Sequence, residues 1–392
     1  METVFISELK PFLDAIAEQM DLYVPKKTGQ DSRKPAPSAL LGAGLSGVEG
    51  AGSQHYVFNR YDPSAEVPVE FNNIRACMPV KEFLFPLREL AAVFPEPVEP
   101  EEIKPFAVFG LKDCDLRSLE CLDQVFLEND FEDPFYVARR EKMFIISSDC
   151  FEPGESCFCS VLDGKPYPDR GFDLNVALVS AKASAGAGQI TEGYVIEIGS
   201  KKGKEFVEKH SELFTEPSDE SIAERDRIRA ETTKQLEQNN AELKFDTPIR
   251  DMMTETYDSD VYDMEAETCV ECQACTRVCP TCHCFYLYDT KQGPRSAGTK
   301  QDYFAKMKMW DSCMRMAYAQ VAGGANPRKI LGDRLKHRLM HKFVYFLDRY
   351  GLQMCIGCGR CVDAEAGNVD IRAVLKKLNE ELKGRKQVKV AK

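Results

Sequence analysis

The sequence predicts an α+β protein in which an N-terminal α/β-type sheet domain precedes a helical, cysteine-rich domain. Between about residues 55 and 215, short apolar runs alternate with helical patterns, as is typical of a sheet covered by helices. Residues 216–265 are polar, acidic and helix-prone, and helical patterns dominate the rest of the chain. We therefore expect a sheet domain over 1–215, an acidic helical connector over 216–265 and a helical domain over 266–392.

The expected elements of the sheet domain follow from hydrophobic periodicity. Residues 114–126 place Leu116, Leu119, Leu122 and Phe126 on one side of a helix. Strands are expected at 105–111, 142–148, 172–179 and 193–200, with a further helix at about 203–214. The first 21 residues predict an amphipathic helix, and residues 29–53, rich in Gly, Ala, Ser and Pro, predict a loop.

Three helices are expected in the C-terminal domain. The first covers 300–322 and ends before Gly323, because glycine commonly follows a helix. The second begins at Asn326, an N-cap followed by proline, and ends before Gly351. The third covers the pattern VDIRAVLKKLNEEL at 369–382.

Charge and hydropathy limit where the chain acts. Its net charge is −12, so its overall field repels nucleic acid and anionic membranes. No apolar run reaches the ~20 residues that cross a bilayer. The N-terminus carries acidic residues early and lacks the basic segment of a secretory signal. These features predict a cytoplasmic protein that neither binds nucleic acid nor spans a membrane.

The cysteine content indicates metal binding. Of 16 cysteines, six precede residue 160 and ten lie between Cys269 and Cys361. In a reducing cytoplasm, clustered cysteines bind metals more often than they form disulfides. The two groups predict two places where metal chemistry occurs.

The first loop, CVECQACTRVCP at 269–280, matches the bacterial pattern C-x2-C-x2-C-x3-C-P. Cys269, Cys272 and Cys275 can bind three corners of a [4Fe-4S] cluster, and Cys279 would ligate the other cluster of a two-cluster ferredoxin. Zinc sites normally use paired C-x2-C hooks to complete one tetrahedron. The pattern therefore favours iron–sulfur clusters over zinc.

The second loop contains Cys355, Cys358 and Cys361 and begins 75 intervening residues after Cys279. Because two expected helices fill this gap, we expect an α-helical ferredoxin domain that holds two [4Fe-4S] clusters. By the crossing rule, Cys279 completes the cluster of the second loop.

The first-loop cluster lacks its expected fourth cysteine, because that position holds Glu365. Glu365 itself can bind iron through its carboxylate, or a thiolate can come from Cys282, Cys284 or Cys313. A [3Fe-4S] cluster needs no fourth ligand. The three cysteines can equally be small buried apolar residues, and the sequence leaves these alternatives open.

Four N-terminal cysteines form another candidate metal site. Cys114 lies at a strand-to-helix junction, Cys150 ends a strand, and Cys157 and Cys159 follow in ESCFC. Loops at strand ends meet at one edge of a sheet, so the four thiols can hold a third [4Fe-4S] cluster. The alternative is four unrelated buried cysteines or a redox-inert structural site.

Two further patterns carry less weight. GAGLSG at 42–47 matches a dinucleotide-binding fingerprint, but it lacks the required flanking strand and helix. RLKHRLMHK at 334–342 is a basic helical segment, which indicates a solvated face or charge compensation beside thiolate-ligated clusters.

Several motifs together resemble a known family. CVECQACTRVCPTCHCF, WDSCM, AGGANPR, HKFVYF and CIGCGRC occur in this order, after FGLKDCDLRSLECLDQVF, DPFYVARREKMFIISSDC, SCFC and GFDLNVALV. Over most of 55–375 the chain resembles the iron–sulfur β subunit of cytoplasmic NiFe sulfhydrogenases. The A subunit of anaerobic sulfite reductase and the B subunit of flavin oxidoreductase–heterodisulfide reductase complexes are similar. The resemblance supports the third cluster, whereas Glu365 departs from the cysteine that members commonly have.

The resemblance implies an electron-transfer subunit without a substrate pocket or catalytic residues of its own. Its clusters would pass single electrons from an NAD(P)H-oxidising FAD flavoprotein to a heterodisulfide reductase, NiFe hydrogenase or sulfite reductase unit. One alternative is a self-contained reductase with a substrate or flavin site in the N-terminal domain. Another is a zinc-stabilised interaction scaffold.

Overall fold

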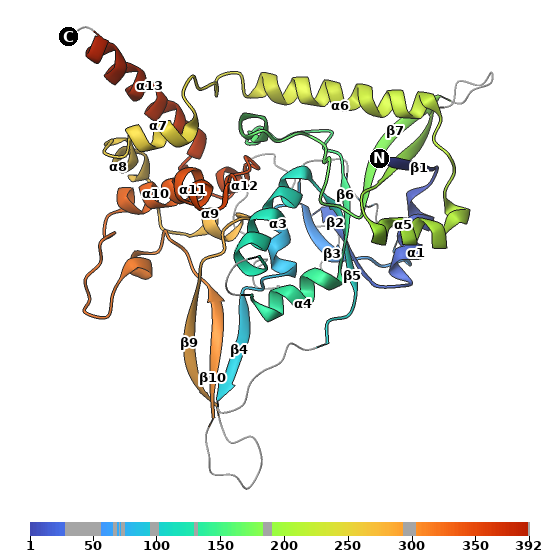
Figure 1. Cartoon of the computed structure of the whole chain (residues 1–392), viewed down its shortest axis with the longest axis horizontal. Helices are drawn as coiled ribbons and strands as arrows, with labels where there is room; N and C mark the ends of the chain where they lie inside the picture. Colours follow the sequence, from blue (N-terminus) through green and yellow to red (C-terminus); the bar gives the residue numbers. More distant parts are fainter. Residues whose placement is uncertain are drawn as a thin grey trace.

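The computed structural model of the chain describes residues 1–27, 56–65, 69, 71, 75–94, 102–128, 132–182, 190–292 and 303–390. Within these residues the architecture is α+β, as the sequence predicts. A mixed seven-stranded sheet forms in the N-terminal part, and helices predominate in the C-terminal part (Figure 1). A second, three-stranded sheet projects from the body at the bottom of the view.

The large sheet has a parallel centre and antiparallel edges. Its order is β1 (Glu2–Ile6), β8 (Ile190–Ile198), β7 (Leu174–Lys182), β6 (Met143–Ser148), β5 (Phe106–Leu111), β2 (Asp21–Lys27) and β3 (Tyr56–Arg60). Strands β2, β5, β6 and β7 are parallel. Every residue of β5 and β6 is buried, because helices cover both faces of the sheet and central parallel strands are therefore continuous apolar runs.

Helices pack on both faces of this sheet. On one face, α3 (Asp113–Phe126) buries Leu116, Leu119, Leu122 and Phe126, the side that the sequence predicts, and α4 (Pro134–Lys142) adds Tyr136 to the same core. On the other face, α1 (Leu9–Ala17) and α5 (Lys201–Lys209) pack with the side chains of β5, β6 and β7. The strands expected at 105–111, 142–148, 172–179 and 193–200 and both expected helices are present.

The helix expected in the first 21 residues is partly wrong, because the chain begins with β1 before α1. Strand β1 pairs with β8, so a distant partner, rather than local periodicity, determines its conformation. The loop expected at 29–53 and the fingerprint at 42–47 lie outside the described residues.

Three helices connect the two parts: α6 (Asp219–Asn239), α7 (Ile249–Glu255) and α8 (Val261–Ala266). Helix α6 lies against β7 and β8 and crosses the top of Figure 1. Its Arg229 pairs with Asp149, at 2.7 Å, and with Glu197, and the guanidinium also lies 4.5 Å from the ring of Tyr167. These buried ion pairs attach α6 to the sheet.

The C-terminal part contains helices of unequal length. They are α9 (Ala274–Arg277), α10 (Leu331–Met340), a π-helical turn (His341–Tyr345), α11 (Phe346–Tyr350), α12 (Arg360–Asp363) and α13 (Ile371–Val390). The second expected helix is present as α10, the π turn and α11, although it begins at Leu331, and the third is present as α13.

Short 3-10 turns occur in both parts of the chain. Within the described residues, four of them cover Val80–Phe83, Cys159–Leu162, Ser211–Leu213 and Met316–Ala319.

The helix expected at 300–322 is wrong. Its first half is strand β10 (Tyr303–Trp310), which lies between β9 (Phe285–Gln292) and β4 (Arg88–Phe94). Both pairings are antiparallel. Strand β4 belongs to the N-terminal part of the chain, whereas β9 and β10 belong to the C-terminal part. This sheet therefore connects the two parts through backbone hydrogen bonds.

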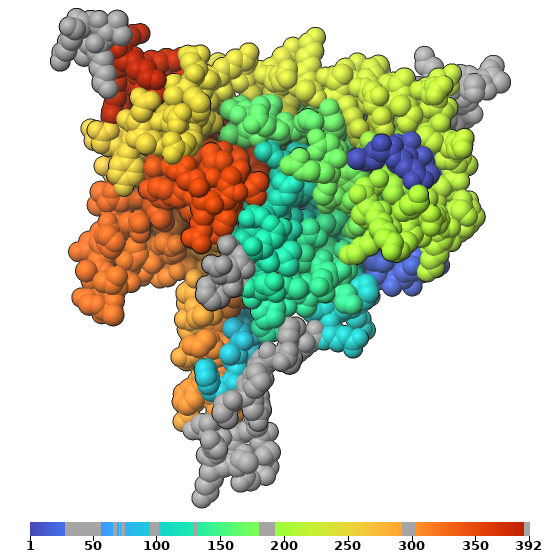
Figure 2. Space-filling model, in the orientation of Figure 1, coloured from blue at the N-terminus to red at the C-terminus, as the bar shows by residue number. Residues whose placement is uncertain are grey.

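The two parts pack against one another in the body of the molecule. In Figure 2 the red-orange C-terminal segment lies directly against the teal segment that contains α3. Arg360 of α12 pairs with Asp115 of α3 at 2.7 Å, and each side chain is 1% exposed. No described helix is both long and apolar enough to cross a membrane.

The Arg229 ion pairs make a testable contribution to stability. Arg229→Ala leaves Asp149 buried without its cation and leaves Glu197 with Arg225 alone, so we expect the free energy of unfolding to fall by roughly 3 kcal/mol. Urea unfolding followed by circular dichroism measures this loss. Arg227→Ala on the same helix is the matched control, because Arg227 is 54% exposed and surface pairs contribute about 1 kcal/mol or less. Equal losses in both variants would contradict the assignment.

Candidate iron–sulfur centres

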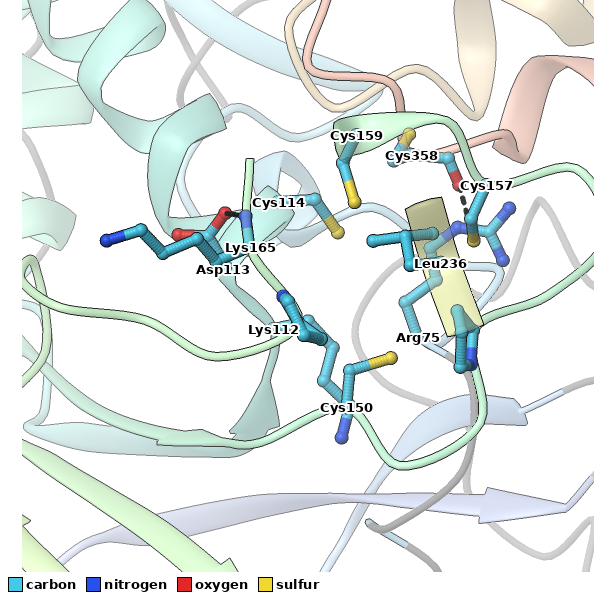
Figure 3. Close-up of a pocket in the computed structure, with 12 residues that line it drawn as sticks. Arg75, Lys112, Asp113, Cys114, Cys150, Cys157, Cys159, Lys165, Leu236 and Cys358 are labelled. Carbon is cyan, nitrogen blue, oxygen red and sulfur yellow. Dashed lines mark hydrogen bonds between the residues drawn. The ribbon is translucent and has the colours of Figure 1, made fainter. Parts of the chain in front are cut away.

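The four N-terminal cysteines Cys114, Cys150, Cys157 and Cys159 line one pocket. Cys114 lies in the first turn of α3, after β5, and Cys150 follows the end of β6. Cys157 and Cys159 lie on the segment that enters the 3-10 turn at Cys159–Leu162. In Figure 3 the four sulfur atoms are directed toward the same space. The structure thus brings these sequence-predicted residues together at one edge of the sheet.

Charged side chains complete the lining of this N-terminal pocket. Buried Lys112 donates hydrogen bonds to the Ser148 hydroxyl at 2.9 Å and to the Asp149 carbonyl at 2.7 Å, and burial lowers the pKa of Lys112. Burial raises the pKa of the Cys150 thiol to about 11 and also raises that of Cys159. Thiolates in this environment therefore need a cation, and iron supplies that charge when it binds and displaces the thiol protons.

The second cysteine loop packs directly against the N-terminal pocket. The Phe158 amide donates to the Gly357 carbonyl at 2.8 Å, and the Cys157 thiol donates to the Cys358 carbonyl at 3.7 Å. Cys358 also lines the pocket, and its sulfur points away from the cavity in Figure 3. The backbone of Cys358 therefore separates the N-terminal thiols from the thiol of Cys358 itself.

Gly357 permits this close approach. Its φ is +67°, and a Cβ atom there would lie 2.6 Å from the backbone nitrogen of Cys159. No side chain fits at that distance, and a positive φ strains residues other than glycine.

Cys279 lies near Cys355 and Cys361 of the second loop, since its charge acts on both thiols. Lys342, in the π-helical turn, donates to the Cys279 sulfur at 3.2 Å. A hydrogen bond from Cys282 and the charge of Lys342 hold the pKa of Cys279 well below its ordinary value. The charge of Lys342 also opposes the rise that burial causes in the pKa of Cys355. The charge of Cys279 adds to the rise that burial causes in the pKa of Cys361. This arrangement favours a thiolate at Cys279 beside the second loop.

Glu365 lies with the first loop. Helix α12, which precedes Glu365, packs on α9, which contains Cys275. Burial raises the pKa values of Cys269 and Cys275, and the Glu365 carboxylate raises both further. Cys272, the remaining thiol of the loop, is exposed.

The three other candidate ligands have different neighbours. Cys282 is buried and hydrogen-bonded to Cys279. The Cys284 sulfur lies 3.8 Å from the Tyr318 hydroxyl. Cys313 is buried, and burial raises its pKa to about 12.

Buried cations surround all three groups of cysteines. The side chains of Arg75, Lys81, Lys112, Arg338, Lys342 and Arg360 are each at most 5% exposed. Nitrogens of Arg75, Arg338 and Arg360 have no hydrogen-bond partner among the described residues. Burial opposes the charged form of Arg75 and Arg338, but nearby thiolates favour it. The charges of Cys157 and Cys358 raise the pKa of Arg75, and those of Cys275 and Cys361 raise the pKa of Arg338. Thiolate-ligated clusters fit here, because they supply the negative charge and sulfur acceptors that these donors lack.

The sequence predicts only part of this cation set. The segment 334–342 suggested either a solvated face or charge compensation, and the structure buries its Arg334, Arg338 and Lys342. Arg75, Lys81, Lys112 and Arg360 were missed. Lys112 and Arg360 are close to cysteines in sequence, but only the tertiary fold buries these four side chains beside the thiols.

Within the described residues, no group of three or more His, Cys, Asp or Glu side chains is placed to hold a single metal ion. The N-terminal thiols line a pocket instead.

Comparison with protein families identifies a 4Fe-4S dicluster domain over residues 268–369, so the C-terminal part belongs to the class of iron–sulfur cluster proteins. Among curated proteins, the β subunit of sulfhydrogenase 2 from Pyrococcus furiosus is 30% identical over 332 residues, which cover 83% of this chain and 90% of that protein. The chain belongs to the sulfhydrogenase β-subunit family and is an iron–sulfur electron-transfer protein. This confirms the family predicted from the motifs.

Lys342 provides a test of charge compensation. Lys342→Gln removes a positive charge 3.2 Å from the Cys279 sulfur, which disfavours the more negative reduced cluster. We expect one midpoint potential to fall by on the order of 100 mV, since a unit charge at this range is worth roughly 3 kcal/mol. A redox titration followed by EPR measures the change. Lys336→Gln, also on this helical segment, is the control, and an equal fall there would contradict a local effect.

Proposed function

We propose that this chain is an electron-relay subunit that carries three [4Fe-4S] clusters. One would be held by Cys114, Cys150, Cys157 and Cys159, a second by the second loop with Cys279, and a third by the first loop. The observation that carries the proposal is the contact of 3.7 Å between the Cys157 sulfur and the Cys358 carbonyl. It joins the N-terminal pocket to a ferredoxin loop without an intervening side chain.

The contacts support an arrangement of the three proposed sites in a line. The second loop lies in the middle, since it contacts the N-terminal pocket through Cys358 and shares Cys279 with the first loop. The first loop lies at the surface, where Cys272 is exposed and the neighbouring Val270 is 61% exposed. We propose that a partner's redox centre approaches at Cys272.

The partners follow from family membership. The relative is a subunit of a sulfhydrogenase, which supports a multi-subunit complex in the cytoplasm for this chain as well. In that complex an NAD(P)H-oxidising FAD flavoprotein would exchange electrons through this subunit with a NiFe hydrogenase unit. A heterodisulfide reductase or sulfite reductase unit is the corresponding partner in the related branches of the family.

Iron and sulfide counting on anaerobically purified protein tests the third cluster. We expect about twelve irons per chain, whereas two clusters alone would give about eight. Cys150→Ser should lower the count by about four and remove one set of EPR signals. Cys121→Ser is the matched control, because Cys121 is buried but does not line the pocket. A count of about eight in the wild type would disprove the N-terminal cluster.

The relay role predicts how the purified chain responds to reductants. Dithionite should bleach its iron–sulfur absorption, whereas NADH and NADPH should not, and no flavin spectrum should be present. The native complex purified from cells should be bleached by NADH or NADPH. Direct reduction of the single chain by NADH or NADPH, or a bound flavin, would favour the self-contained reductase.

A further inference from the structure

We propose that Glu365 is the fourth ligand of the first-loop cluster, so that three thiolates and one carboxylate hold its four irons. The inference rests on the proposed function, because it requires a cluster in the first loop. It assigns a metal ligand to a position where the family commonly has cysteine.

The backbone places Glu365 beside the first loop. The Thr268 hydroxyl donates to the Gly367 carbonyl at 2.5 Å. A Cβ atom on Gly367 would lie 2.4 Å from the Thr268 carbonyl oxygen and 3.0 Å from the Cys269 Cα atom. Only glycine permits such an approach, so the segment that carries Glu365 is in van der Waals contact with the residue that begins the cysteine loop.

The carboxylate itself is held in place. Its Oε1 accepts a hydrogen bond from the Gly367 amide at 3.1 Å, which fixes the side chain near its own backbone. The carboxylate acts electrostatically on Cys269 and on Cys275, so it lies near two of the three first-loop thiols. A ligand that completes a cubane must lie near the other ligands of the same cluster.

An unpartnered buried cation supports an anionic centre at this point. Arg338 is 3% exposed, and its Nε and Nη2 have no hydrogen-bond partner among the described residues. The charges of Cys275 and Cys361 act on it most strongly. The guanidinium therefore lies between the two loops, where both clusters would accept from its free nitrogens.

The competing cysteines fit less well. Cys282 is hydrogen-bonded to Cys279, which lies near the second loop. Cys284 lies beside Tyr318. The charge of Cys313 contributes to the raised pKa of Cys275. Cys313 is itself close to Cys284, whose charge contributes to the raised pKa of Cys313. Glu365 lies two residues from Gly367, which is in contact with the backbone of Thr268 and Cys269, so the geometry favours the carboxylate.

A carboxylate makes one corner of the cluster chemically distinct. Oxygen is a harder ligand than thiolate and holds a cluster iron less firmly. In a cluster held by Glu365, ferricyanide would take one electron from [4Fe-4S]2+ and become ferrocyanide. The resulting [4Fe-4S]3+ would release the carboxylate-bound iron as Fe2+ and leave [3Fe-4S]+.

The experiment compares four proteins by EPR and iron counting during ferricyanide titration of the full chain. In the wild type we expect a three-iron signal that grows to one per chain. Glu365→Cys should form that signal roughly tenfold more slowly, and Glu365→Gln should show it from the start with about one iron fewer. Cys313→Ser, which removes the nearest competing thiol, is the matched control and should behave as the wild type does.

Several results would overturn the inference. A three-iron signal that is unchanged in Glu365→Cys shows that position 365 is not the missing corner, and so does a wild type that resists ferricyanide. A three-iron form in Cys313→Ser, with Glu365→Gln unaffected, assigns the ligand to Cys313. If Glu365→Cys does not fold, the comparison of Glu365→Gln with Cys313→Ser decides. Protein without iron and sulfide in all four samples overturns the proposed function as well, which distinguishes the two failures.

Discussion

Buried positive charge around the cysteines is the constraint on which the rest of the structure depends. Six lysine and arginine side chains are almost fully buried there, and a buried charge is strongly unfavourable without a partner. Carboxylates pair with only some of them, as Asp115 pairs with Arg360, while two nitrogens of Arg338 have no partner among the described residues. The fold therefore favours negative charge at the cysteines, which thiolate-ligated clusters would supply, and we expect folding and cluster binding to be coupled.

The same constraint explains how the two ends of the chain fit together. Cations from the N-terminal part reach the ferredoxin loops, since Lys81 donates to the Cys282 carbonyl at 2.9 Å and Arg75 lies beside Cys358. In the opposite direction, Arg360 reaches from α12 to α3. The cysteine sites thus lie where the sheet meets the helical part, and each part contributes the charges that the thiols of the other part need.

Local patterns predicted the parts of the structure that local interactions determine. β5 and α3 were predicted because a buried strand and an amphipathic helix carry their periodicity within a few residues, and C-x2-C-x2-C spacing marks a loop wherever it folds. Strand β10 was mistaken for a helix, because pairing with β4, about 200 residues earlier in the chain, determines its conformation. The apolar alternation of FYLYDTKQ in β9 was a missed signal. The place of Arg75 was not predictable, because only tertiary contacts bring it to Cys157 and Cys358.

The two ferredoxin loops lie in different electrostatic environments. Lys342 donates to the Cys279 sulfur, and a cation so close stabilises the more negative, reduced state of a cluster. At the first loop a carboxylate, Glu365, acts on Cys269 and Cys275 and disfavours additional negative charge. These two charges favour an additional electron at the second loop over one at the first loop. Cys272 of the first loop is exposed, whereas Cys355 and Cys358 are buried, so a cluster held by the first loop would be suited to brief exchange with a partner.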